Sequence, residues 1–266
     1  MVESAPLLRE YGLIAHRGFE SLALRHFNNS NFSGEGMVTV LVTGANRGIG
    51  LEFVKHYLGR GDRVIGTYRD IVSSKELIQM GEDHDSLEIL TLDVGSDKSL
   101  KDFPNQLGDQ PIDIFINNAG VFGPRNSTFN NVDEKNWIPA LRINAIAPLL
   151  LTQLIIENLR KSSLKKLIYI TSKMGSIDDN KGGGSYVYRS SKTALNAVVK
   201  SISVDLADEG MLVALLHPGW VRTDMGGPNG LIDTNTSVSG MIKVIDGLEQ
   251  TRSGSFFNYD GAEISW

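Results

Sequence analysis

The amino-acid sequence predicts an α/β protein whose doubly wound parallel sheet has about seven strands, with helices on both faces. Short apolar runs alternate along the chain with longer amphipathic segments. The apolar runs are nearly continuous, as in strands buried on both faces, and the amphipathic segments have the length of crossover helices. Alternation of this kind implies right-handed crossovers and hence a parallel sheet. The chain has 266 residues, enough for one large domain with a substantial core.

The predicted domain runs from residue 37 to residue 266, without an internal repeat or a linker. Its expected strands span residues 38–42, 63–68, 87–92, 112–116, 167–171, 212–216 and 255–258. Its expected helices span residues 49–58, 100–107, 137–159, 187–206 and 238–248. We therefore expect a single domain that binds its ligands at the carboxyl ends of the strands, as doubly wound folds do.

Residues 1–36 differ from the rest of the chain, because leucines and arginines there lead into a polar stretch that contains glycine. One interpretation is a weak mitochondrial targeting segment, and the other is a flexible extension that precedes the fold. The acidic residues Glu3, Glu10 and Glu20 argue against import, and Met37 would serve equally well as a start. We expect a cytoplasmic protein, with a mitochondrial location as the alternative.

Composition argues against several classes of function. The formal net charge is -5, whereas a nucleic-acid surface needs clustered lysines and arginines. The chain has no cysteine, so it has neither disulfide bonds nor thiolate metal ligands, and its five histidines lack the spacing that binds zinc. No apolar run approaches the roughly 20 residues of a membrane-spanning helix. We therefore expect a small-molecule ligand, and no metal, nucleic acid or membrane.

A glycine-rich turn follows the first strand. It reads Thr-Gly-Ala-Asn-Arg-Gly-Ile-Gly over residues 43–50 and leads directly into a helix. Glycines allow the tight turn and the close approach of a pyrophosphate, and the helix N-terminus favours negative charge. Because a glycine motif alone is weak evidence, an ordinary turn is the alternative interpretation. In a Rossmann-type sheet, the residues here that would contact a dinucleotide are Gly44, Asn46, Arg47, Gly48, Ile49 and Gly50.

Charge at the end of the second strand indicates which dinucleotide binds. An NAD site usually has an acidic residue there, which accepts hydrogen bonds from the ribose, whereas an arginine suits the 2′-phosphate of NADP. Arg69 follows the second strand, and Arg47 lies in the glycine-rich turn. Two arginines directed at one region predict NADP(H). Asp70 opposes this prediction, since a shift of register would make it the NAD-type acid.

Tyr188 and Lys192 are the candidate catalytic pair. Residues four apart on a helix share a face, so the phenol and the ammonium group can point into one pocket. An unperturbed tyrosine has a pKa of about 10, and a nearby cation lowers this pKa because it favours the phenolate. General acid–base catalysis then becomes possible. Tyr186 is the rival phenol, but its fourth neighbour, Ser190, supplies no charge.

The Thr-Gly-x-x-x-Gly-x-Gly spacing, the Asn-Asn-Ala-Gly segment at residues 117–120 and the Tyr-x-x-x-Lys pair resemble the short-chain dehydrogenase/reductase family. The resemblance implies that Ser172 hydrogen-bonds the substrate carbonyl and that Tyr188 donates a proton. It also implies that Lys192 holds the nicotinamide ribose and lowers the tyrosine pKa, while Asn144 supports a water that connects the lysine to solvent. The same resemblance implies cofactor contacts at Asp93, Val94, Asn118, Ala119, Gly120, Pro218, Gly219, Val221 and Thr223.

Four segments are similar to a narrower group, the C-factor and sniffer-type carbonyl reductases. They are residues 172–177, 186–189, 218–228 and 254–261. This similarity implies NADPH-dependent reduction of an aldehyde, ketone or quinone, and it is compatible with a homodimer or a tetramer. The alternative is an NADP-binding signalling protein of the C-factor type, whose role depends on cofactor occupancy. The intact serine, tyrosine and lysine argue against pure binding.

The substrate itself corresponds to no recognisable motif. Residues 121–129, 173–187 and 224–234 are expected to form its pocket, and a fold does not determine a substrate. Ser172 and Tyr188 are sixteen positions apart (188 − 172), a few more than is usual in the family. Glycines 182–184 are expected to absorb the excess in a mobile loop. If that loop were rigid and displaced, the serine would be the residue that leaves the site.

Overall fold

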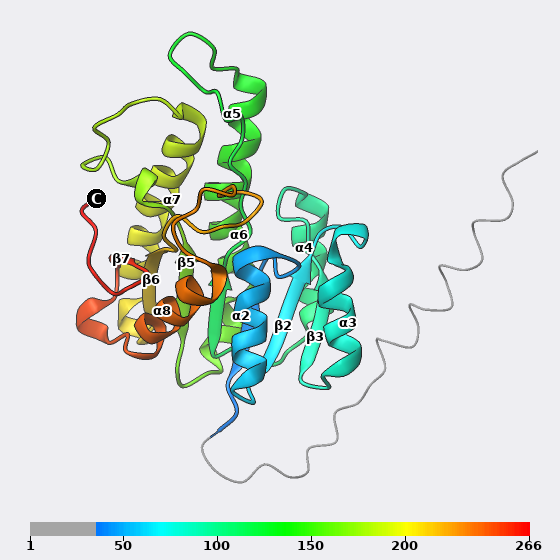
Figure 1. Cartoon of the computed structure of the whole chain (residues 1–266). Helices are drawn as coiled ribbons and strands as arrows, with labels where there is room; N and C mark the ends of the chain where they lie inside the picture. The colour runs from blue at the N-terminus through cyan, green and yellow to red at the C-terminus, as the bar shows by residue number, and fades with distance from the viewer. Residues whose placement is uncertain (1–35) are drawn as a thin grey trace, which may run out of the picture. The chain divides into compact units, whose positions relative to one another are not determined.

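The structure, a computed structural model that describes residues 36–266, contains one sheet of seven parallel strands (Figure 1). The strands are β1 (Thr39–Val42), β2 (Arg63–Tyr68), β3 (Leu87–Thr91), β4 (Ile114–Asn117), β5 (Lys166–Ile170), β6 (Leu212–His217) and β7 (Ser255–Asn258). Their order across the sheet is β3-β2-β1-β4-β5-β6-β7. The predicted doubly wound, Rossmann-type fold is thus confirmed. Residues 1–35, on which the predictions of an extension and a targeting segment depend, lie outside the described residues.

Helices cover both faces of the sheet (Figure 1). One face is packed by α2 (Gly48–Gly59), α3 (Lys75–Asp83) and α8 (Thr234–Asp246), and the other by α4 (Asp97–Leu107), α6 (Ala147–Arg160) and α7 (Tyr186–Asp205). Short 3-10 turns occupy Val72–Ser74, Lys173–Gly175, Ala207–Glu209 and Gln250–Arg252. In β1, Val40 and Val42 belong to the apolar core under α2, α3 and α8, and Leu41 belongs to the core under α4, α6 and α7. Successive residues of a strand point to opposite faces, so a strand buried on both faces is apolar throughout.

One described helix, α3, was not predicted from the sequence. Its nine residues are mostly polar, and Leu77 is its one buried side chain. The chain enters this region through Asp70, whose carboxylate accepts hydrogen bonds from the N–H groups of Val72 and Ser73. Such a local side-chain turn starts helical structure without an apolar pattern. The pattern alone therefore gave no signal for α3.

The long helix predicted at residues 137–159 is two helices joined by a π-helical turn. α5 (Glu134–Leu141) leads into the turn Arg142–Ile146, which leads into α6. The N–H of Ala147 donates to the carbonyl of Arg142, five residues back, as in a π turn. Pro148 follows and has no N–H, so the carbonyl of Asn144 lacks the donor that an α-helix would place four residues on. The turn thus changes the backbone bonding at a predicted site residue.

The run Glu134–Arg160 is long and apolar enough to cross a membrane by length and composition alone, and an 18-residue window within it has a mean hydropathy of 1.5. From the sequence alone, no apolar run of that length was expected. In the structure α6 packs against β4, α4 and α7, and its side chains Leu151, Ile155 and Leu159 are fully buried. A core helix of a globular domain has the same composition, and this packing accounts for it.

Candidate active site

A cleft of about 660 Å³ opens at the carboxyl ends of the strands, where β1 and β4 lie side by side and the strand order reverses. Dinucleotides bind at this position in doubly wound sheets, and the volume falls within the usual range of ligand pockets. Most of the predicted site residues line it: Gly44, Asn46, Arg47, Gly48, Ile49, Gly50, Arg69, Asp93, Val94, Asn118, Ala119, Gly120, Tyr188, Lys192, Pro218 and Thr223. The fold therefore brings together segments that are far apart in the sequence.

The glycine-rich turn at residues 43–50 has room for nothing larger than glycine at its critical points. Gly44 has a φ of 62°, in the left-handed region. A Cβ atom on Gly50 would lie 2.2 Å from the carbonyl oxygen of Gly44. The turn is therefore wound tightly at the N-terminus of α2, with its backbone open to the cleft. This arrangement fits the phosphates of a dinucleotide.

The Asn-Asn-Ala-Gly segment holds the glycine-rich turn from the neighbouring strand. Thr43 Oγ1 accepts hydrogen bonds from the N–H groups of Asn118 and Ala119, each at 3.0 Å. The Asn118 amide donates to the carbonyls of Thr43 and Gly44, at 2.9 and 3.1 Å. Asn118 thus lines the cleft, but its amide nitrogen is bonded to the turn. Its structural task is to fix the turn against β4.

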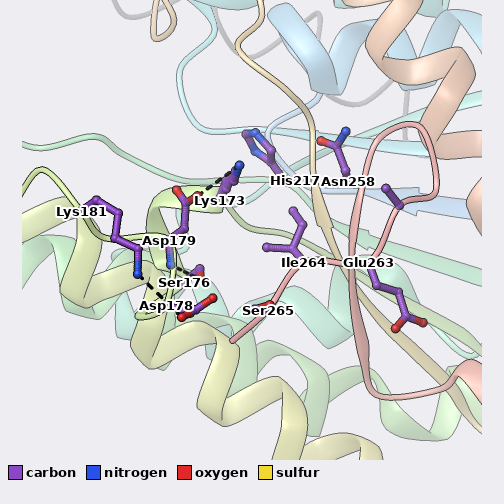
Figure 2. A pocket seen from close by; sticks show the side chains of 11 residues that line it. Lys173, Ser176, Asp178, Asp179, Lys181, His217, Asn258, Glu263, Ile264 and Ser265 are labelled. Atoms are coloured by element: carbon purple, nitrogen blue, oxygen red, sulfur yellow. Dashed lines mark hydrogen bonds and ion pairs between the residues drawn. The ribbon is translucent and has the colours of Figure 1, made fainter.

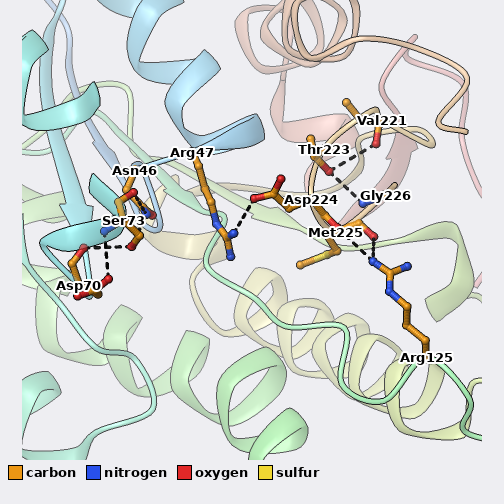
Figure 3. Close-up of polar contacts among 10 residues, drawn as sticks. All are labelled: Asn46, Arg47, Asp70, Ser73, Arg125, Val221, Thr223, Asp224, Met225 and Gly226. Atoms are coloured by element: carbon orange, nitrogen blue, oxygen red, sulfur yellow. Dashed lines mark hydrogen bonds and ion pairs between the residues drawn. The ribbon is translucent and has the colours of Figure 1, made fainter. Parts of the chain in front are cut away.

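The far end of the cleft contains the residues that bear on the choice between NAD and NADP. Arg69 and Asp70 both line it, directly after β2. The Asp70 carboxylate accepts hydrogen bonds from the N–H groups of Val72 and Ser73. The Ser73 hydroxyl has the largest part in lowering the pKa of this carboxylate, and the two N–H groups add to it. Asn46 donates to Ser73, which joins the glycine-rich turn to this loop (Figure 3).

Arg47 points away from that end. Its guanidinium pairs with the carboxylate of Asp224 at 2.7 Å, and this ion pair joins the glycine-rich turn to the segment after β6 (Figure 3). Both side chains are largely exposed, at 67% and 77%. Arg47 is therefore directed at the segment after β6, whereas the sequence predicted that it and Arg69 would both be directed at the end of β2.

The candidate catalytic residues are buried at the other end of the cleft. Tyr188 and Lys192 lie on α7 and line the cleft, and Ser172 follows β5. The Ser172 hydroxyl lies near enough to the phenol of Tyr188 to lower the pKa of the tyrosine. Ser172 does not line the cleft itself, and its Oγ also accepts from the N–H of Met174. Lys192 Nζ donates to the carbonyl of Ile170 at 2.9 Å. The serine and the tyrosine meet in spite of the long loop between them.

Burial controls the pKa values of these groups. Burial raises the pKa of Tyr188 to about 12, and the nearby Ser172 hydroxyl acts in the opposite direction. Burial also lowers the pKa of Lys192 to about 8, because it disfavours the charged ammonium. The sequence led us to expect that the lysine lowers the tyrosine pKa. In this structure burial has the larger effect, in the opposite direction.

Asn144 lies beneath the cleft, in the π turn. Its side chain is 1% exposed, and its amide oxygen accepts from the N–H of Val121 at 2.9 Å. Its amide nitrogen donates to the Val121 carbonyl and to the hydroxyl of Ser191. The side chain therefore ties the segment after β4 to α7, which carries Tyr188. Ser191 was missed in the sequence, because a serine inside a helix has no distinctive signal.

Two predicted cofactor contacts, Gly219 and Val221, do not line the cleft. Gly219 has a φ of 83°, and a Cβ there would lie 2.8 Å from Ile232. Val221 is 3% exposed and pairs with Ile232 in an isolated β-bridge. Both residues shape the segment after β6, whereas Pro218 and Thr223 reach the cleft.

A second hollow, of about 420 Å³, lies between the loop after β5 and the chain after β7 (Figure 2). It contains none of the predicted site residues. Lys173 pairs there with Asp179 at 3.1 Å, and burial lowers the pKa of His217 to about 4. Part of the loop expected to form the substrate pocket thus faces this second hollow instead. Among residues 36–266, no group of three metal-binding side chains was found.

The sequence profile described as short chain dehydrogenase matches residues 38–231. The chain belongs to this family. The predicted resemblance is confirmed, and the protein is a short-chain dehydrogenase/reductase and hence an oxidoreductase. Its matched region contains the glycine-rich turn, Ser172, Tyr188 and Lys192.

Three similar proteins define the neighbourhood within the family. "C-signal" of Myxococcus xanthus is 44% identical over 167 residues, which are 63% of this chain and all of that protein. The carbonyl reductase Sniffer of D. melanogaster has a TM-score of 0.81 at 34% identity, over 87% of this chain and all of that one. An NADPH-bound carbonyl reductase from chicken fatty liver has a TM-score of 0.80 at 36% identity, over 86% and 99% of the two chains.

Proposed function

We propose that this short-chain dehydrogenase/reductase uses NADPH to reduce the carbonyl group of a small molecule, with Tyr188 as the proton donor. The observation that carries the proposal is the placement of Tyr188. Its phenol is near the Ser172 hydroxyl, it lies one helical turn from Lys192, and it lines the same cleft as the glycine-rich turn. A dinucleotide bound along this cleft would bring its nicotinamide next to the phenol.

The residues of the cleft fit a dinucleotide. Gly44 and Gly50 leave the backbone of the turn accessible, and the N-terminus of α2 supplies N–H groups for phosphate. Arg69 would pair with a 2′-phosphate, which favours NADP(H) over NAD(H). The Asp70 carboxylate is already bonded to two backbone N–H groups, which leaves it less able to accept from a ribose. The NADPH bound to the chicken carbonyl reductase supports the same choice.

The roles of the chain's own groups follow from their geometry. The Ser172 hydroxyl would donate to the carbonyl oxygen of the substrate, and the Tyr188 hydroxyl would transfer its proton to that oxygen as negative charge develops. The nicotinamide, when bound, supplies the hydride. Lys192, with a pKa of about 8, exchanges protons close to neutral pH and is suited to return a proton to the tyrosine. A cation next to the phenol opposes the effect of burial on its pKa.

Asn144 would connect this relay to solvent. Its side chain is fully engaged by Val121 and Ser191, so the group left for a water is its backbone carbonyl. That carbonyl has no N–H four residues on, because Pro148 stands there. The π turn and the proline thus support the proposed water site.

A panel of carbonyl compounds, assayed with NADPH and with NADH, tests the proposal. We expect oxidation of NADPH with at least one reactive aldehyde, diketone or quinone, and a much lower kcat/KM with NADH. The variant Arg69→Ala should lose far more affinity for NADPH than for NADH. Equal losses for the two cofactors would refute the assignment of NADP(H), and a panel without any turnover would refute the reductase.

The similarity to C-signal favours a second candidate function, signalling through cofactor occupancy. In that case cofactor binding would matter and turnover would not. The two functions differ in their dependence on Tyr188, because its hydroxyl serves proton transfer and contributes little to holding the dinucleotide. A cellular phenotype that a chain with Tyr188→Phe restores in full would favour signalling, and one that it does not restore would favour the reductase.

A further inference from the structure

The loop between β4 and α5, residues 118–133, contacts both sides of the candidate active site. On one side lies the capping segment, which we define as residues 218–233 after β6. On the other side lies the first turn of α7, which carries Tyr188. From the sequence, part of this loop was expected only to form a variable wall of the substrate pocket. Its contacts are more specific than that.

Arg125 joins the loop to the capping segment. Its guanidinium donates to the backbone carbonyls of Asp224 and Met225, at 3.1 and 2.9 Å (Figure 3). Both hydrogen bonds come from one terminal nitrogen, Nη2, which carries two hydrogens and can therefore serve two adjacent carbonyls. The contact is made to backbone atoms, so it does not depend on the protonation of the partner.

The same arginine lies over an aromatic ring. The Arg125 guanidinium carbon is 5.5 Å from the centre of the Phe122 ring, within the range of a cation–π contact. The Phe122 ring in turn stacks on Tyr188, with ring centres 4.3 Å apart and an angle of 23° between the planes. A continuous series of contacts therefore runs from the capping segment through Arg125 and Phe122 to the proposed proton donor.

Two further contacts fix the loop to α7. The N–H of Val187, in the first turn of the helix, donates to the hydroxyl of Ser127 at 3.2 Å. Ser185, the residue before the helix, provides no side-chain cap and has a φ of 49°. Ser127 thus acts as the cap from a distant segment. A Cβ on Gly123 would come within 3.0 Å of Val187, so loop and helix are closely packed.

The capping segment has a second tie in the Arg47–Asp224 ion pair. Both partners are largely exposed, and ion pairs in that situation contribute little and weaken with salt. Arg125 makes two hydrogen bonds and a ring contact in the same region. Arg125 therefore links the capping segment to the ring of Phe122, which the Arg47–Asp224 pair does not do.

We infer that Arg125 is a positioning residue, which acts through Phe122 to fix the position of the capping segment relative to the ring of Tyr188. The inference rests on the proposed function, since it assigns Tyr188 the proton transfer. Loss of the guanidinium lets the capping segment and Phe122 move independently, so a bound carbonyl meets a less well placed phenol. Phe122 also forms an aromatic wall beside the phenol, which favours planar, conjugated carbonyl compounds.

The test is a double-mutant cycle on the full chain with Arg125→Met and Phe122→Leu, assayed with saturating NADPH and a reactive diketone or quinone. We expect Arg125→Met to lower kcat/KM about tenfold, because it removes two charge-assisted hydrogen bonds and a cation–π contact. In the Phe122→Leu background the same change should lower kcat/KM less than about twofold, since the contact through which it acts is already lost. If the loss of kcat/KM in the double variant equalled the product of the losses in the two single variants, the inference would be overturned.

A matched control is available in Arg252, whose guanidinium lies 4.4 Å from the ring centre of Phe257 and donates to the carbonyl of Gly261. Arg252→Met removes the same kind of contact outside the cleft and should leave kcat/KM unchanged. Arg125 is exposed, so its replacement should leave the core intact. An unchanged midpoint of thermal unfolding would verify this. Equal values of kcat/KM for Arg125→Met and Arg252→Met would overturn this inference but not the proposed function. An active Tyr188→Phe variant would instead overturn the proposed function.

Discussion

Replacing Lys192 by methionine should change how the stability of the protein depends on pH. The pKa of this lysine is lowered by burial from 10.5 to about 8. Between these two values the unfolded chain binds a proton that the folded chain does not. The free energy of unfolding therefore rises with pH across this window. Below pH 8 both states carry the proton, and this contribution is absent.

The size of the effect follows from the gap between the two pKa values. At roughly 1.4 kcal/mol per pH unit, a change from 10.5 to about 8 corresponds to about 3 kcal/mol. Methionine has no such proton, so the variant should lack this rise. Other titrating groups that do not interact with Lys192 are present in both proteins, and they cancel when the two curves are subtracted.

Urea unfolding of both proteins, followed by circular dichroism from pH 7 to pH 10.5, measures this difference. The wild type should gain about 3 kcal/mol relative to Lys192→Met across the range. Subtraction of the curves also removes the constant cost of leaving the Ile170 carbonyl without its donor. Parallel pH dependences would show that Lys192 is not buried with a lowered pKa, and would refute the reasoning.

Three further predictions concern the cleft. Gly50→Ala should reduce NADPH affinity more than 100-fold by fluorescence titration, about 3 kcal/mol or more, because the new Cβ would lie 2.2 Å from the Gly44 carbonyl. Gly59→Ala, where nothing lies within 4 Å, should bind normally, and equal affinities would contradict the expected clash. Thr43→Val should lower the free energy of urea unfolding by about 2 kcal/mol, since two N–H groups lose their acceptor; an unchanged midpoint would exclude that role. Asp224→Asn removes the carboxylate that pairs with Arg47, so NADPH binding by this variant should lack the part of its salt dependence that comes from the ion pair. Identical slopes of NADPH affinity against salt concentration for the variant and the wild type would contradict this contribution.

Much of the fold was predictable because strands that are buried on both faces have continuous apolar runs in the amino-acid sequence. The expected strands at 63–68 and 255–258 coincide with β2 and β7, and the others differ by one or two residues. The helix α3 escaped prediction because it buries one side chain and depends on the turn at Asp70. The π turn escaped because a proline in a helical pattern does not say how the backbone around it is bonded.

The candidate site was predictable where function needs residue types at fixed spacing. The glycine-rich turn and the pair Tyr188 and Lys192 are of that kind, and the structure brings them to one cleft. The contacts of Phe122 and Arg125 were not predictable, since they join loops whose positions only the folded chain defines. The pKa of Tyr188 also could not be read from spacing, because burial depends on the packing of the whole site.

The rate of NADPH oxidation by Tyr188→Phe, with a reactive diketone or quinone, tests the proposed proton transfer most directly. The variant keeps the ring that stacks on Phe122 and loses only the hydroxyl. We predict that kcat falls by about 10³-fold, the contribution expected of a general acid. The dissociation constant for NADPH should stay within about twofold of the wild type, because the hydroxyl contributes little to holding the dinucleotide. Full activity in this variant would contradict the assignment of Tyr188 as the proton donor.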